Sequence, residues 1–171
     1  MARDSQQMEL IRQLCRMRNL NEDDTLTITK KLLEQYRNAL WMSGSITGGA
    51  NSILQCEGKE EVRQWYLHLK DLTQDELDDA SIDSMIFHVC RTDWILRVIN
   101  CVMVRVKDFH SGGDIYYEIL DKSYFSKEKE TDQEIAEVLH LERSNYYRKK
   151  KEAVLFFGVL LWEEAKNRKF A

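Results

Sequence analysis

The chain has 171 residues, of which 32% are charged and 43% hydrophobic, and its formal net charge is −4. This balance is typical of a globular protein with one helical domain or two small ones. The acidic total gives no overall attraction to nucleic acid, so a nucleic-acid function would have to rest on local basic patches. Because the chain contains no proline, we expect long uninterrupted helices.

Cysteine spacing and hydropathy exclude several classes of protein. No C-x-x-C pair occurs, so zinc-ribbon and thioredoxin motifs are absent. His88 and Cys90 form H-x-C on an apolar stretch, and we interpret them as core side chains rather than metal ligands. No apolar run approaches the roughly 20 residues that span a bilayer, and the polar N-terminus predicts no signal peptide. We therefore expect a cytoplasmic protein of bacterial or phage origin, with no membrane association and reduced thiols at Cys15, Cys56, Cys90 and Cys101.

The N-terminal third predicts two amphipathic helices and a loop. Residues 2–20 and 26–42 carry apolar side chains at helical spacing, and a break separates them. We expect Asp24 or Thr25 to cap the second helix. The glycine-rich segment Ser43–Asn51 lacks the lysine of a Walker phosphate loop, so we interpret it as a connection.

An acidic stretch follows the amphipathic helix predicted over residues 60–72. Residues 71–83 contain six acids and no lysine or arginine. Carboxylates can bind metal or transfer protons, but the spacing here lacks the glycine that an EF-hand loop needs. A solvated helix face or an acidic partner surface is the favoured interpretation.

Residues 83–109 form the longest apolar-periodic segment. Their length and the absence of glycine and proline favour a core helix, with a strand near Val102–Val106 as the alternative. The sequence HSGGD at 110–114 predicts the end of this helix. We place a domain boundary there, between an N-terminal helical region at 1–110 and a helix-turn-helix domain at 111–171. A lead-in helix over 114–125 and a charged loop then precede the motif.

Residues 131–153 read as two helices joined by a tight turn. Thr131 and Glu134 form a capping box, which predicts a helix that starts at Asp132. The turn falls at residues 140–142, and a second helix begins near Arg143. Small Ala136 suits a close helix crossing, and we expect Leu141 and Tyr146 to close a small core.

The second helix continues to about Lys166 and is apolar on all sides over residues 154–162. A helix of this kind is buried all round. One side must pack on its own domain, and the other on the N-terminal helices or on a second subunit. We expect a homodimer through this helix to supply part of that burial. The fold class predicted is all-α, an N-terminal helical bundle plus a C-terminal helix-turn-helix with an extended second helix.

The segment EIAEVLHLERSNYYRKKKEA at 134–153 resembles the C-terminal helix-turn-helix of ArpU-type phage transcriptional regulators, which is similar to region four of sigma factors. The resemblance covers roughly residues 95–165 and implies control of late phage genes. The chain departs from the family pattern at His140, where the turn usually has glycine, and at Glu142, where a serine usually starts the second helix. The matching residues are Glu134, Ile135, Ala136, Leu139, Tyr146, Tyr147, Arg148, Lys150, Glu152 and Ala153.

These observations predict a sequence-specific DNA-binding protein without catalytic residues, metal or cofactor. Asn145 and Arg148 can bond adenine and guanine edges, and Lys149 and Lys151 can hold phosphates, helped by Lys127 or Lys129. Tyr147 would contact a thymine methyl or a sugar, or serve only in packing. The candidate DNA-binding residues are Arg143, Ser144, Asn145, Tyr147, Arg148, Lys149 and Lys151.

Three other interpretations stay open at this point. The basic run is a solvated helix face in many proteins. The same motif would serve in a DNA-packaging protein, such as a small terminase subunit that forms a ring. A protein-interaction module would bind a partner such as RNA polymerase through its acidic stretch.

Overall fold

The computed structural model describes residues 5–42, 93–110, 112–126 and 128–167, and the regular elements in these ranges are all helical, as predicted. Four expectations fall outside the described residues: the connection at 43–51, the helix at 60–72, the acidic stretch at 71–83 and the His88–Cys90 pair. Cys56 and Lys127 lie outside them as well. The elements are α1 (Gln6–Met17), α2 (Glu22–Met42), α6 (Asp93–Lys107), α7 (Gly113–Leu120), the π-helical turn η1 (Asp121–Phe125), α8 (Asp132–Val138) and α9 (Arg143–Asn167).

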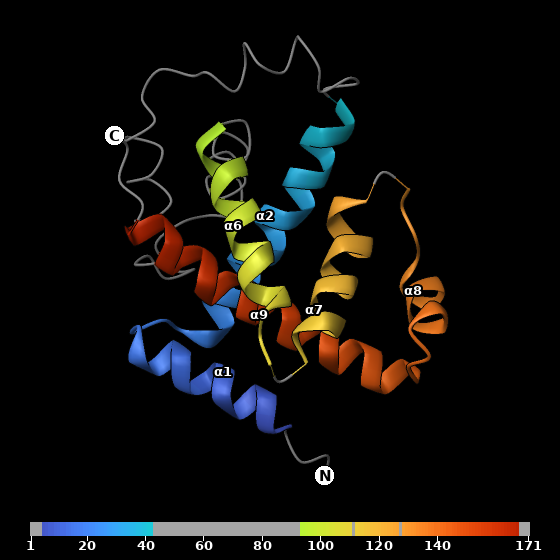
Figure 1. The fold of residues 1–171 in the computed structure, drawn as a ribbon, viewed down its shortest axis with the longest axis horizontal. Coiled ribbons are helices and arrows are strands. Elements are labelled where there is room, and N and C mark those ends of the chain that lie inside the picture. The colour runs from blue at the N-terminus through green and yellow to red at the C-terminus, as the bar shows by residue number, and fades with distance from the viewer. Residues whose placement is uncertain (1–4, 43–92, 111, 127, 168–171) are drawn as a thin grey trace.

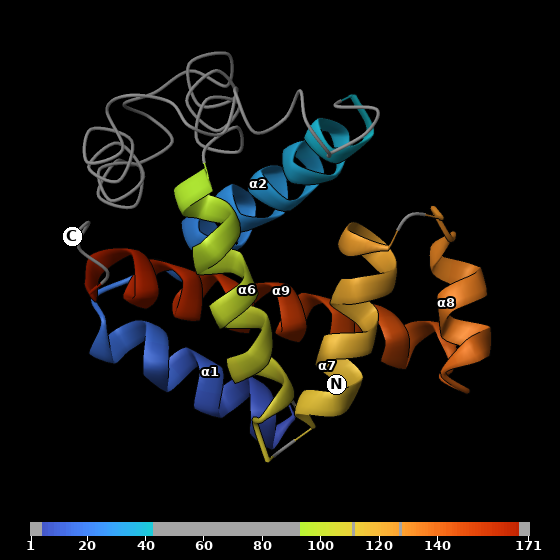
Figure 2. The ribbon, with the colours of Figure 1, turned by 45° about the horizontal axis from the view of Figure 1, so that its top comes forward.

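Helix α9 is the centre of the molecule. It runs through the middle of the fold, with α1 along it, α2 and α6 crossing it farther along, and α7 crossing nearer its start (Figures 1 and 2). Only α8 lies at the outer end, beside the first turns of α9 (Figure 2). The main core consequently forms around the second half of α9 and leaves its first half at the edge of the molecule.

Helices α1 and α2 each begin at a polar N-cap. Ser5 Oγ accepts a hydrogen bond from the Met8 amide at 3.1 Å and starts α1. Asn19 has φ 56° after the last turn of α1, and the Leu20 amide returns to the Cys15 carbonyl at 2.8 Å. Asn21 Oδ1 then accepts from the Asp24 amide at 3.0 Å.

The predicted start of α2 was therefore wrong. The helix begins at Glu22 rather than at residue 26, and Asn21 caps it rather than Asp24 or Thr25. Asparagine is a strong N-cap because its side-chain oxygen reaches the amide three residues on. The three acids that follow at 22–24 stabilise the positive end of the helix dipole.

Helices α6 and α7 meet at a glycine corner. The strand considered near Val102–Val106 does not form, because this segment is helical within α6. A Cβ on Gly113 would overlap the carbonyl oxygen of Val106, so only glycine lets α7 start this close to α6. The predicted lead-in helix over 114–125 is confirmed as a continuous helical segment, which changes to π winding at Asp121.

The apolar part of α9 is buried within one chain. Residues 154–161 are all buried and Trp162 is half-buried. Gly158 lies against α2 so closely that a Cβ there would overlap Thr29 Oγ1. The N-terminal helices are thus the cover that the sequence required, and burial of α9 gives no argument for a second subunit. The homodimer remains a prediction without that support.

One hydrophobic cluster extends across the expected domain boundary at residue 110. It combines side chains of α1, α2 and α6 with those of α7 and α9. Among the described residues, no helix combines the length and apolarity needed to cross a bilayer.

Candidate nucleic-acid interface

The first helix of the unit, α8, begins at the predicted capping box. Thr131 Oγ1 accepts from the Glu134 amide at 3.2 Å, and Glu134 Oε2 accepts from the Thr131 amide at 2.9 Å. This pair satisfies two amides that the helix cannot bond internally. The expected start of the helix at Asp132 is confirmed.

The turn after α8 has a defined hydrogen-bond pattern. The His140 amide donates to the Glu137 carbonyl at 3.1 Å, and the Leu141 amide donates to the Ala136 carbonyl at 2.9 Å. These are the two bonds of a Schellman motif, whose middle residue adopts the left-handed conformation. His140 has φ 56°, so the histidine takes the same backbone conformation that a glycine would supply at this turn.

A small separate core holds α8 against α9 and α7. Ile135, Ala136 and Tyr146 are buried there with Ile119, and Leu141 packs against them. The predicted core of the unit is therefore confirmed. It is distinct from the main core and lies at the outer end of α9.

Asp132 ties the two helices together. Its Oδ1 accepts hydrogen bonds from the Tyr146 hydroxyl and from Lys150 Nζ, each at 2.7 Å. Burial alone would raise the pKa of Asp132, but the bonds from Lys150 and Tyr146 outweigh it and lower that pKa. Burial and the bond to Asp132 raise the pKa of Tyr146. Lys150 therefore has a structural partner within the unit.

Glu152 joins α9 to two other helices through a fully buried carboxylate. Its side chain is 0% exposed, accepts a hydrogen bond from Ser5 Oγ, and accepts another at 2.7 Å from the Tyr116 hydroxyl. Burial and the Glu152 bond raise the pKa of Tyr116. A buried polar group requires such partners, so Glu152 fixes the N-terminus of α1 and the helix α7 to α9.

Five of the seven candidate residues share one exposed face of α9. At about 100° per residue, Arg143, Ser144, Tyr147 and Arg148 lie within about 80° of Lys151 around the helix. All five side chains are exposed. Further along α9 the same face is covered by α1 and α2, so the exposed strip is confined to the first turns.

The other two candidates lie outside this strip. Asn145 is half-buried at its edge, about 120° from Lys151 around the helix. Its Oδ1 accepts a hydrogen bond from Arg148 Nη2 at 2.6 Å. Lys149 is also half-buried and points about 160° away from Lys151. Asn145 is therefore linked to the five exposed residues by its hydrogen bond with Arg148, whereas Lys149 lies on the other side of the helix.

An open hollow of about 780 Å³ lies between this strip and α1. Arg148 and Lys151 line one wall, and Arg12 of α1 lines another, together with His140 of the turn. Arg12 also pairs with Glu22 at 3.1 Å. Sequence reasoning missed Arg12, because α1 is remote in the chain and no local pattern indicates that it packs beside α9. His140 was singled out there only for its place in the turn.

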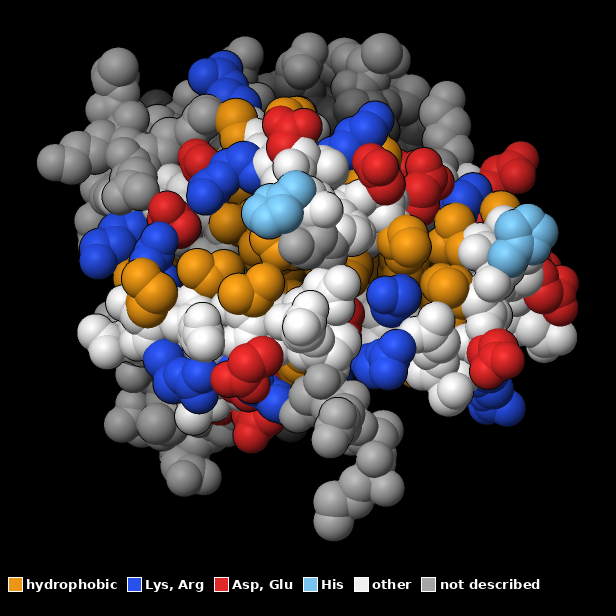
Figure 3. Space-filling view, turned by 60° about the horizontal axis from the view of Figure 1, so that its bottom comes forward, with side chains coloured by type: hydrophobic (Ala, Val, Ile, Leu, Met, Phe, Trp, Pro, Cys, Tyr) orange, Lys and Arg blue, Asp and Glu red, His pale blue; other side chains and the backbone are white. Residues whose placement is uncertain are grey.

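Charge on this side of the molecule is mixed. Basic and acidic side chains are interspersed on the face that includes α1, and hydrophobic ones run between them (Figure 3). Arg143 stacks on the Tyr147 ring at 5.9 Å, which keeps two exposed side chains of the strip together. In the ranges that the structure describes, no group of three or more His, Cys, Asp or Glu side chains is placed to hold a metal ion.

The fold and this geometry define an all-α protein with a short helix, a tight turn and a long helix whose first turns are exposed. Comparison of the chain with protein-family models, with curated proteins and with solved structures gave no match.

Proposed function

We propose that the protein is a sequence-specific DNA-binding transcriptional regulator in which the first turns of α9 enter a major groove. The resemblance to ArpU-type regulators adds that its targets are late phage or prophage genes. RNA polymerase would then be the machinery it acts on. The acidic stretch at 71–83 is expected to be a solvated helix face or an acidic partner surface, and under the second interpretation it would contact such a partner.

The observation that carries this proposal is the contrast along α9. Residues 152–161 are buried on every side, while the first turns of the helix present a strip of five exposed side chains. Solubility alone does not require arginine, serine, tyrosine and lysine on one strip, and these are side chains that contact base edges and phosphates. In helix-turn-helix docking it is the N-terminal part of the second helix that reaches the bases.

Rigid support for the strip also favours recognition. The Asp132 bonds to Tyr146 and Lys150 hold α8 on α9, and Glu152 anchors the next turn to α1 and α7. A recognition element that is fixed before binding loses less conformational entropy on binding. The Asn145–Arg148 hydrogen bond places two base-reading groups together, and it must exchange for bonds to bases on docking.

Binding to short fluorescent DNA duplexes, followed by anisotropy, tests the proposal. We expect the wild-type chain to bind at low salt, and Arg148→Ala and Lys151→Ala to weaken binding by about 10-fold, within the range of one base or phosphate contact. Lys149→Ala is the matched control, because it removes the same charge from the opposite side of the helix.

Equal losses for Lys149→Ala and Lys151→Ala would mean that the effect is general charge and not a docked face. An absence of binding at low salt would reject the DNA-binding proposal and favour a protein-interaction module. Light scattering on the same samples separates regulation from packaging, since a large closed ring would favour the packaging role.

A further inference from the structure

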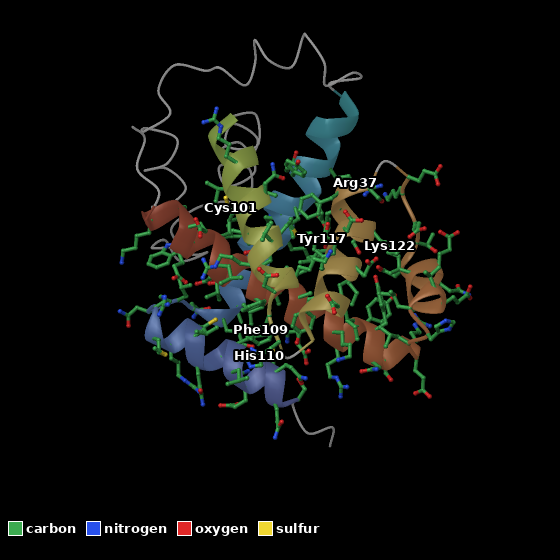
Figure 4. The ribbon with its side chains drawn as sticks, viewed as in Figure 1. Arg37, Cys101, Phe109, His110, Tyr117 and Lys122 are labelled. Carbon is green, nitrogen blue, oxygen red and sulfur yellow. The ribbon has the colours of Figure 1, made fainter. Side chains whose placement is uncertain are left out.

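Arg37 is a buried cation with unused hydrogen-bond donors. It lies on α2 beside η1 (Figure 4), is only 7% exposed, and donates from Nη1 to the Ser123 carbonyl at 3.0 Å. Its Nε and Nη2 are buried and have no hydrogen-bond partner. An arginine offers five N–H donors, and leaving charged donors unsatisfied in the interior is costly. The Nε and Nη2 groups can therefore donate hydrogen bonds to a partner that accepts two of them.

The space in front of Arg37 is large enough for such a partner. An open hollow of about 610 Å³ is bounded by α2, η1, the loop before α8, and one side chain each of α8 and α9. This volume is within the range of small-molecule sites, about 300–1,000 Å³. It is separate from the exposed strip of α9, since none of the five side chains of that strip lines it.

The charges around the hollow favour an anion. Four cations line it, Lys30, Arg37, Lys129 and Lys150, against three carboxylates, Glu34, Glu130 and Asp132. Asp132 is already engaged by Lys150 and Tyr146. Glu130 Oε2 forms an ion pair at 3.9 Å with Lys122, which is not part of the lining, and has no hydrogen-bond partner. Three cations, Arg37, Lys30 and Lys129, then remain in the lining. Glu34 is the one carboxylate there that forms neither the Asp132 contacts nor the Glu130 ion pair just described.

We infer that this hollow binds a phosphate group, with Arg37 as the buried anchor and Lys30 and Lys129 as the second and third contacts. The planar guanidinium matches two phosphate oxygens through Nε and Nη2, the two nitrogens without partners. The phosphate could belong to the backbone of bound DNA or to a phosphorylated small molecule. The inference does not depend on DNA binding, although the first source would extend the proposed DNA contact to α2.

Thermal unfolding of the full chain with inorganic phosphate tests the site, with sodium chloride at the same ionic strength as reference. Phosphate at about 100 times its Kd should raise the Tm of the wild type by on the order of 5–10 °C. The rise should be lost in Arg37→Gln, which keeps an amide donor for the Ser123 carbonyl, and reduced in Lys129→Gln. Lys107→Gln is the matched control, an exposed lysine on α6 that lies outside the lining.

Lys129 lies in an exposed loop, so its variant keeps the test valid even if Arg37→Gln does not fold. Phosphate stabilises many proteins weakly by exclusion from their surface, and that effect would be the same in all variants. An equal rise in Lys129→Gln, Lys107→Gln and wild type would overturn the inference, as would a wild type that phosphate stabilises no more than chloride.

Two further measurements distinguish the sources of the phosphate. If the site takes a DNA phosphate, Lys129→Gln should flatten the slope of log K against log salt for duplex binding by about one unit. If it takes a small molecule, adenosine monophosphate should bind more tightly than inorganic phosphate or adenosine, with duplex binding unchanged in Lys129→Gln. Stabilisation by inorganic phosphate alone, with neither of these effects, would identify the free ion as the ligand.

Discussion

The hydroxyl of Tyr146 donates a hydrogen bond to Asp132 Oδ1 at 2.7 Å and thereby fastens α9 to the first residue of α8. Burial and this bond raise the pKa of Tyr146, whereas the bonds from Lys150 and Tyr146 outweigh burial and lower the pKa of Asp132. The bond holds the orientation of the exposed strip on α9, because Tyr146 belongs to the same helical turns as the strip.

Tyr146→Phe should lower the free energy of unfolding by about 1–2 kcal/mol. A hydrogen bond to a charged group contributes roughly 1.5–3 kcal/mol, and the partial exposure of Asp132 reduces it. Urea denaturation followed by circular dichroism measures the difference. Tyr147→Phe is the matched control: the neighbouring tyrosine is exposed, and loss of its hydroxyl should change stability by less than about 0.5 kcal/mol. Equal effects of the two substitutions would contradict the role given to the Asp132 bond.

Because of Asp132, the free energy of unfolding should decrease as the pH is lowered into the acid range. Its folded pKa is lowered from the ordinary 3.8, so the ionised form stabilises the fold at any pH above that value. The stabilisation is lost as the pH falls through the folded pKa, where the native carboxylate is protonated too. The stability advantage of wild type over Asp132→Asn should therefore be full at neutral pH and shrink below about pH 4. An advantage that is constant down to pH 2 would show that the charge has no part in it.

The His140→Gly protein should be more stable than the His140→Ala protein. At φ 56° a side chain costs about 1–2 kcal/mol, whereas glycine adopts this conformation freely. We expect His140→Gly to exceed His140→Ala in free energy of unfolding by about 1 kcal/mol. The matched pair is Glu137→Gly and Glu137→Ala, on the exposed side of α8, where the order should reverse because glycine is the poorer helix former. The same order at both positions would rule out the left-handed turn.

The turn shows how much of the unit the sequence could predict. The capping box at Thr131 and the small core around Tyr146 follow local rules, and both were predicted correctly. The histidine at a glycine position left the turn geometry open. The structure resolves it through the Schellman bonds of His140 and Leu141, which satisfy backbone groups whatever the side chain.

Longer-range features could not be predicted from local patterns. The apolar sides of α9 required cover all round, but the sequence did not say which elements supply it. In the structure α1, α2 and α6 supply it. In the sequence Glu152 matched the family pattern, but nothing local indicated its partners, which come from residues 5 and 116. Arg37 gave no signal at all, because its burial depends on the contact between α2 and η1.

Tyr116→Phe should test the buried Glu152 network. Removal of the hydroxyl leaves Glu152 Oε2 buried without this donor, at a cost of about 1–3 kcal/mol. The pKa of Tyr116 is raised, so its contribution is complete below the ordinary pKa of 10.0 and declines as the pH rises above it. Wild type should therefore lose more stability than Tyr116→Phe between pH 9 and pH 11. Tyr117→Phe, at a half-buried neighbour, serves as control, and parallel pH profiles for all three proteins would contradict the account.

The central claim is that the exposed strip of α9 reads DNA sequence. Selection of bound duplexes from a random library, with sequencing of the enriched pool, tests it most directly on wild type, Arg148→Ala, Asn145→Ala and Lys149→Ala. The account predicts a defined motif for wild type and for Lys149→Ala. In the other two variants it predicts a relaxed preference at one or two base positions, at a cost of roughly 1–3 kcal/mol on the preferred site and with melting temperatures close to wild type. A wild-type pool without enrichment, or the same motif from all four proteins, would contradict it.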